Sequence, residues 1–239
     1  MLLEILLIGL IIFLASFNQG FSGFGFAITS IPLLSLIIDV KAAIPLAAIC
    51  GMTMNIILTY KLKSFINFSE LKFLIMGSII GIPFGAIFLS KASPDLILKI
   101  LAVVILVFVF INTTHFIKPF EIHKKWGVLF GFISGVLGGA FNTNAPPVLI
   151  YFYLKDWNKF KQKAMITGFF IVASVLIVTS HAVSGVTTKD VLVKAAYSFP
   201  FLIGGLFLGM SIFPKISTRL YRKLILVFLA AISIILILR

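Results

Sequence analysis

Two clusters of polar and glycine residues lie inside long uncharged stretches of the chain, and their residue types suit binding of a small anion. They occupy residues 18–25 (NQGFSGFG) and 138–147 (GGAFNTNAPP). Amide and hydroxyl side chains donate hydrogen bonds, and glycine lets the backbone approach a bound group closely. A helix starting beside such a cluster adds free N–H groups and about half a unit of positive charge. The predicted binding residues are Asn18, Gln19, Gly20, Ser22, Gly23, Gly139, Asn142, Thr143 and Asn144.

The alternative interpretation is that these glycines only allow helices to pack closely, as we expect for glycines 77, 81 and 85 and for glycines 127, 131 and 135. Helix packing does not require the polar run Asn142-Thr143-Asn144, so we favour binding at the two clusters. Other polar residues in the following apolar stretches could complete the site, although hydrogen bonds to neighbouring helices explain them equally well. These are Thr53, Asn55, Thr167, Ser174 and His181.

The composition identifies an integral membrane protein. Apolar residues make up 61% of the 239 positions and charged residues only 11%, which is more hydrophobic surface than a water-soluble domain can bury. The net charge of +13 comes from lysines and arginines in short connections, so we expect them to set membrane topology and not to bind nucleic acid. The first residues have no basic region before the apolar run, and we expect them to remain in the mature chain.

Two of the apolar stretches are too long for one membrane helix. Residues 5–38 and 126–154 would span roughly 51 Å and 44 Å as single helices, against a hydrocarbon core of about 30 Å. Both must therefore break, and the polar clusters mark where. The eight apolar stretches are 5–38, 42–60, 73–90, 100–117, 126–154, 164–188, 195–214 and 224–238.

The basic residues favour a hairpin at each break. If all eight stretches cross the membrane, nine basic residues lie on one side and eleven on the other; if the two broken stretches return as hairpins, the division is fourteen to six. Because basic residues concentrate in cytoplasmic loops, the hairpin arrangement is preferred. It leaves both termini outside the cytoplasm and three full crossings in each half, so the halves have opposite orientations.

An internal repeat supports this division. Gly81, Gly85 and three later polar residues recur in the second half at an offset of 124, and the first cluster matches the second at an offset of 115. We therefore predict an all-α integral membrane fold of two inverted repeats, each a broken-helix re-entrant hairpin followed by three transmembrane helices. The predicted domains are 1–117 and 126–239, joined by a cytoplasmic linker at 118–125.

Several motifs are missing from the sequence. No Asp or Glu lies within the apolar stretches, so a carboxylate proton relay has no evident residue. There is no phosphate-binding loop, no HExxH and no Cys/His cluster. We expect no enzyme activity, no metal and no cofactor, with transport energy coming from the substrate gradient, an ion bound by neutral oxygens, or a proton carried by the substrate.

The ordered pair of glycine-rich segments resembles the TauE/SafE family. The first segment leads to Pro32-Leu33-Leu34, and the second, residues 131–139, leads to Pro147-Val148-Leu149. The glycine-containing helices at Gly81 and Gly205 extend the similarity over essentially the whole chain. The resemblance implies a bacterial-type inner-membrane exporter of sulfite or organosulfonates. The family commonly has consecutive glycines at each break, whereas this chain has residues 22–25 (SGFG) and 139–142 (GAFN), so its substrate can differ.

We therefore expect a secondary transporter that exports a small sulfur-containing oxyanion by alternating access between the repeats. An anion channel, or a non-transporting membrane scaffold or lipid-handling protein, stays open as an alternative. The expected partners are the anion and the lipid bilayer, without nucleic acid, and a homodimer is one open option for the assembly.

The hairpin arrangement places both chain termini outside the cytoplasm. A tag fused to either end should therefore be reached by a membrane-impermeant label or protease added to intact cells from the outside. A tag accessible only after the inner membrane is opened would contradict this topology.

Overall fold

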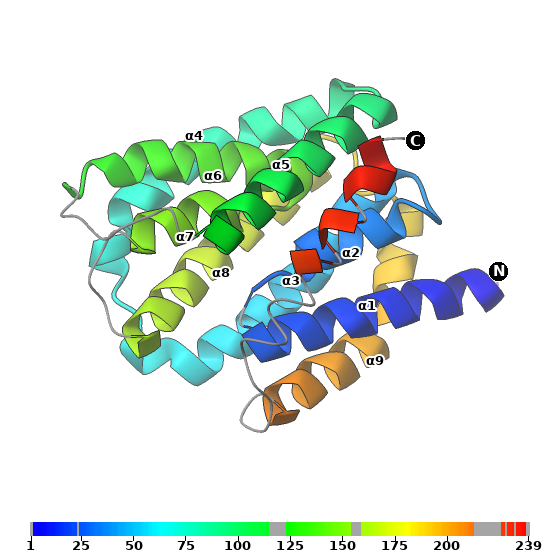
Figure 1. Ribbon diagram of the computed structural model, residues 1–239, viewed down its shortest axis with the longest axis horizontal. Helices are drawn as coiled ribbons and strands as arrows, with labels where there is room; N and C mark the ends of the chain where they lie inside the picture. Colours follow the sequence, from blue (N-terminus) through cyan, green and yellow to red (C-terminus); the bar gives the residue numbers. More distant parts are fainter. Residues whose placement is uncertain are drawn as a thin grey trace. The chain divides into compact units, whose positions relative to one another are not determined.

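The computed structural model describes residues 2–22, 24–114, 123–153 and 159–212, together with 226–227, 229–231 and 233–237 near the C-terminus. Within these ranges the secondary structure is helical, without strands, as predicted (Figure 1). The last predicted helix, 224–238, is described only in part. The helices are α1 Leu2–Ser22, α2 Phe26–Leu34, α3 Val40–Leu62, a 3-10 turn η1 Lys63–Phe65, α4 Phe68–Lys91, α5 Pro94–Thr114, α6 Trp126–Phe141, α7 Ala145–Tyr153, α8 Lys159–Val183 and α9 Lys189–Ile212.

Five helical segments among the described residues are long and apolar enough to cross a membrane. Their outer surfaces carry large apolar side chains such as Ile80 and Phe84, which are 56% and 61% exposed. Surfaces of this kind are stable when lipid covers them, which agrees with a multi-pass membrane protein. The five segments are Leu3–Phe21, Val40–Phe65, Phe68–Lys91, Ala164–Val183 and Lys189–Ile212.

Both long stretches break inside the predicted clusters, but each break is shorter than its cluster. Helix α1 continues through Asn18 and Gln19 to Ser22, and α6 continues through Gly139 to Phe141. The first break therefore lies between Ser22 and Phe26, and the second is residues 142–144. Glycine disfavours helix on its own, yet in α1 and α6 it lets a neighbouring helix pack close, and this packing keeps the glycine segments helical.

The chain reverses direction at both breaks. The Tyr151 hydroxyl near the end of α7 donates to the carbonyl of Lys124, just before α6 begins, at 3.4 Å, and the Tyr151 ring lies 5.6 Å from that of Phe130. In the first hairpin, Asn18 near the end of α1 bonds to Thr29 in α2. These contacts show that the chain folds back on itself at both breaks.

The chain forms two compact units, and each combines elements of both predicted halves. The first unit is Met1–Cys50, Ala92–Phe116 and Thr188–Arg239, and the second is Gly51–Lys91 and Ile117–Thr187. The first hairpin thus shares a unit with α9, and the second hairpin shares a unit with α4.

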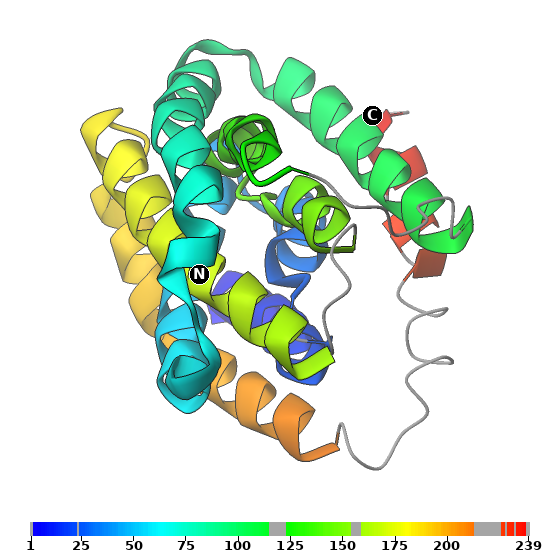
Figure 2. The same ribbon diagram turned by 90° about the vertical axis from the view of Figure 1, so that its left-hand side faces the viewer.

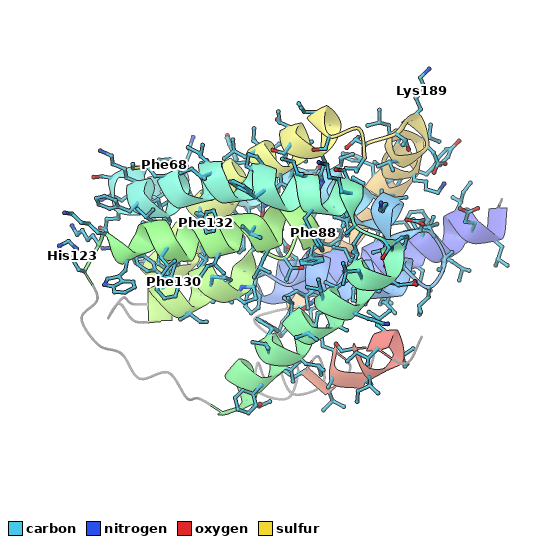
Figure 3. The ribbon with its side chains drawn as sticks, turned by 90° about the horizontal axis from the view of Figure 1, so that it is seen from above. Phe68, Phe88, His123, Phe130, Phe132 and Lys189 are labelled. Carbon is cyan, nitrogen blue, oxygen red and sulfur yellow. The ribbon has the colours of Figure 1, made fainter. Side chains whose placement is uncertain are left out.

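In the second unit, α4 and α6 run parallel and in very close contact (Figure 3). A Cβ atom added at Gly77, Gly81 or Gly85 of α4 would collide with backbone carbonyl oxygens of α6. Lipid supplies no hydrophobic drive for helices to associate, so close van der Waals contact across small residues has to hold this pair together.

The first unit repeats this packing with α1 and α9, which lie side by side (Figures 1 and 2). A Cβ at Gly205 or Gly209 of α9 would collide with the carbonyl oxygens of Phe13 and Phe17 in α1. Each hairpin therefore has its long first helix held against a glycine-bearing helix from the other half of the sequence.

The two helix pairs correct the predicted offset between the hairpins. Gly81 packs on the carbonyl of Phe132, and Gly205 packs on that of Phe13, which gives 132 − 13 = 119. The helix bounds agree, since α2 starts at 26 and α7 at 145. The predicted offset of 115 is therefore wrong by four residues, about one helical turn. Small residues recur at each turn on these faces, so a slip of one turn aligns nearly as many of them.

Two adjacent glycines of α9 provide a matched test of the close packing. Gly205→Ala should destabilise the protein by about 1–3 kcal/mol, because its methyl group would overlap the Phe13 backbone. Gly204→Ala should be close to neutral, since its Cβ would lie 3.5 Å from the Phe13 ring, an ordinary contact. Thermal unfolding of both variants in detergent measures the difference, and equal midpoints would contradict the packing described for α1 and α9.

Candidate functional site

The first break is held together by side chains from the end of α1. The Asn18 amide donates to Thr29 Oγ1 at 2.8 Å and to the carbonyl of Gly25 at 3.4 Å. Gln19 Oε1 accepts the backbone N–H of Phe26, the first residue of α2, at 3.2 Å. Both amide hydrogens of Asn18 are therefore engaged in closing the hairpin.

Glycine is required at the last position of this break. Gly25 has φ 98°, a left-handed conformation, and a Cβ there would lie 2.9 Å from Asn18 Nδ2. Gly20, another predicted site residue, lies against the carbonyl of Leu206 in α9 and so occupies a packing position. Gly23 and the side chain of Ser22 lie outside the described residues.

Residues of the second break supply hydrogen bonds to the backbone carbonyls at the end of α6. Asn142 adopts a left-handed conformation with φ 50°, and its N–H donates to the carbonyl of Gly138 at 2.8 Å. The N–H of Thr143 donates to the carbonyl of Leu137 at 3.3 Å, and its hydroxyl donates to that of Phe141 at 2.9 Å. Carbonyls at a helix end have no helical partner, and here the break residues supply one.

His181 provides another partner for the end of α6. Its Nε2 lies 2.7 Å from the carbonyl oxygen of Gly139, which can only accept, so Nε2 carries the hydrogen. The His181 side chain is fully buried, and its Nδ1 has no hydrogen-bond partner among the described residues. His181, one of the five residues predicted to complete the site, thus bonds to α6 three residues before the second break begins.

The side-chain amides of Asn142 and Asn144 do not take part in holding the second break together. Both residues are half-buried, and neither amide hydrogen-bonds to another described residue. The Asn144 contact is through its backbone carbonyl, which accepts from the Ser134 hydroxyl at 2.7 Å. The tip of the second hairpin thus carries two side-chain amides without hydrogen bonds to the part of the chain that the structure describes.

The remaining predicted residues lie on α3 and α8 in the second unit. The Asn55 amide donates to the carbonyl of Phe170 at 3.4 Å, linking the two helices, and the Ser174 hydroxyl donates to its own helix at Ile171. Thr53 is half-buried on α3, and Thr167 is buried on α8. The Asn55 bond joins two helices, and the Ser174 bond stays within one helix. Both agree with the alternative interpretation, in which these polar residues stabilise helices and do not bind substrate.

Four hydroxyl residues of the hairpins were not predicted. Thr29 bonds across the first break to Asn18, and Ser134 of α6 bonds to the backbone carbonyl of Asn144 in the second break. Pairing residues at similar distances on either side of the first break would have found Thr29. Ser16 and Ser30 are fully buried, and their hydroxyls lack partners among the described residues. No sequence signal separates these two from ordinary helix serines.

The fold defines a class of protein: a multi-pass α-helical membrane protein with two helical hairpins, each of which has polar residues at or near its break. A family model described as sulfite exporter TauE/SafE matches residues 8–236, and the chain belongs to this family. Comparisons with curated proteins and with solved structures found no match. In the part of the chain that the structure describes, no group of His, Cys, Asp and Glu residues could hold a metal ion.

The contribution of the His181 hydrogen bond to stability can be measured by substitution, with the nearby Ser184 hydroxyl as a control. His181→Phe should destabilise the protein by about 1–3 kcal/mol, because it leaves the Gly139 carbonyl without this donor in a buried position. His181→Gln retains a hydrogen-bond donor and should lose less stability than His181→Phe. Ser184→Ala removes only a bond to the nearby Ser180 carbonyl and serves as the control. Equal unfolding midpoints for His181→Phe and Ser184→Ala would show that the bond does not stabilise the end of α6.

Proposed function

We propose that this protein is a secondary transporter that exports a small sulfur-containing oxyanion, sulfite or an organosulfonate, and that it binds this anion at the second break. The observation that carries the proposal is the pair of side-chain amides, Asn142 and Asn144, without hydrogen bonds to other described residues. The family membership supports the sulfur-containing substrate class.

Two asparagine amides suit an oxyanion. Each NH₂ group has two hydrogens to donate, so the pair could replace part of the hydration shell of a sulfite or sulfonate group. The start of α7 adds a partial positive charge. Pro146 and Pro147 have no N–H, so the first turn of α7 has fewer backbone donors than an ordinary helix start, and side-chain amides take on a larger share.

The uncharged character of the site fits transport better than tight capture. Hydrogen bonds from neutral amides are weaker than an ion pair with a buried arginine or lysine, so the bound anion can also leave. The first hairpin has a different role in this proposal, since Asn18 and Gln19 hold its shape.

Transport would proceed by alternating access between the two inverted repeats in a bacterial-type inner membrane. Equivalent packing of α4 on α6 and of α9 on α1 supports two equivalent halves. Exchanging the conformations of two such halves would convert an outward-open shape into an inward-open one.

The site should be tested by flux of sulfite and of an organosulfonate in proteoliposomes. Asn142→Gly is the sharper substitution, because glycine keeps the left-handed backbone at φ 50° while alanine would strain it. Combined with Asn144→Ala, it removes both amides, and flux should fall on the order of tenfold or more, since a hydrogen bond to a charged group contributes about 1.5–3 kcal/mol. Thermal stability without substrate should stay near that of the unmodified protein.

Ser211→Ala, which removes an exposed hydroxyl bonded to its own helix, should leave flux unchanged. Undiminished flux in the double variant would reject the assignment of the site. Saturable flux with counter-transport is expected from a transporter. Single-channel currents would instead identify a channel, and the absence of any anion flux or anion-dependent stability would favour a scaffold.

A further inference from the structure

A groove between α4 and α6 carries features unrelated to the hairpin tips. Its volume is about 600 Å³, and it opens on the outer surface of the second unit. The floor is apolar and includes Ile80 of α4 and Val128, Leu129 and Phe132 of α6. Gly77 also lines the groove, at the point where α4 lies directly against the backbone of α6.

The groove ends at a group of basic and aromatic side chains. His123, Lys125 and Trp126 line this end, and all three are exposed. Figure 3 shows His123 at the start of α6, with Phe132 further along the same helix. The groove therefore has an apolar part along the helices and a basic part at their end.

The basic end has no neutralising partner among the described residues. No salt bridge joins Lys125 to a described acidic residue, and Glu70, in the first turn of α4, is paired with Lys161 at 3.1 Å. The first backbone N–H groups of α6 already bond to the carbonyls of His123, Lys124 and Lys125. An anion at this end would therefore be held chiefly by side chains, with some help from the positive end of α6.

We propose that this groove is a binding site for an anionic phospholipid, with its phosphate headgroup at His123 and Lys125 and an acyl chain along the apolar floor. Trp126 has an apolar ring and one N–H, the combination favoured at the level of lipid headgroups. Basic residues beside a groove between membrane helices are the arrangement that attracts such lipids. A soluble anion would leave the apolar floor uncovered, whereas a zwitterionic lipid would gain less from the positive charge.

The proposal can be tested with purified protein in detergent, given an equimolar mixture of phosphatidylglycerol and phosphatidylcholine with the same acyl chains. Native mass spectrometry measures the ratio of the two lipids bound. The unmodified protein should retain phosphatidylglycerol preferentially. Lys125→Gln should reduce this preference about fivefold, the effect expected for one basic residue at the membrane surface. Lys189→Gln, which removes an exposed charge at the start of α9, should leave the preference intact.

The apolar half of the site needs its own variant. Val128→Trp should fill the groove and reduce retention of both lipids, while Ile87→Trp, at an exposed apolar position of α4 that does not line the groove, should not. Equal retention of the two lipids by the unmodified protein would overturn the proposal. So would retention unaffected by both Lys125→Gln and Val128→Trp.

Two further outcomes would identify another occupant. Complete displacement of phosphatidylglycerol by millimolar inorganic phosphate would mean that the site recognises only a soluble anion. Loss of a dimer in Val128→Trp, with unchanged lipid ratios, would mean that the groove is covered by a second copy of the chain. These measurements require no substrate flux, so they are independent of the proposed transport function.

Discussion

A helix that breaks within a membrane exposes carbonyl and N–H groups that lipid cannot hydrogen-bond, so the protein itself must supply their partners. In the second hairpin, Asn142, Thr143 and His181 bond the carbonyls at the end of α6. In the first hairpin, Asn18 and Gln19 bond groups at the break and at the start of α2. The two hairpins therefore depend on a few polar side chains in otherwise apolar helices and, in the second hairpin, also on the backbone N–H groups of the break.

Close helix packing holds these hairpins in place. The long arm of each one lies parallel to a glycine-bearing helix, with backbone against backbone. Because α1 packs with α9 and α6 with α4, each compact unit uses elements from both halves of the sequence. This packing joins the hairpin of each half of the sequence to a helix of the other half.

Sequence reasoning located both breaks and predicted the chain reversals, because hydrophobic length and the distribution of basic residues are properties of short segments. It failed on the register of the hairpins. Matching Gly20 to Gly135 gave an offset of 115, whereas the contacts of Gly20 and Gly139 give 119. Residues one turn apart share a helix face, so only the partner helix distinguishes the two alignments.

The sequence by itself determined that this is an all-α membrane protein of the TauE/SafE family and that polar residues interrupt two of its helices. Only the tertiary structure decided which of those residues have partners. Asn18 is engaged by Thr29, eleven residues away, and Gly139 by His181, forty-two residues away, while the Asn142 and Asn144 amides have no bond to a described residue. A sequence shows how many hydrogens each side chain can donate, but the acceptors are brought within reach only when the chain folds back on itself.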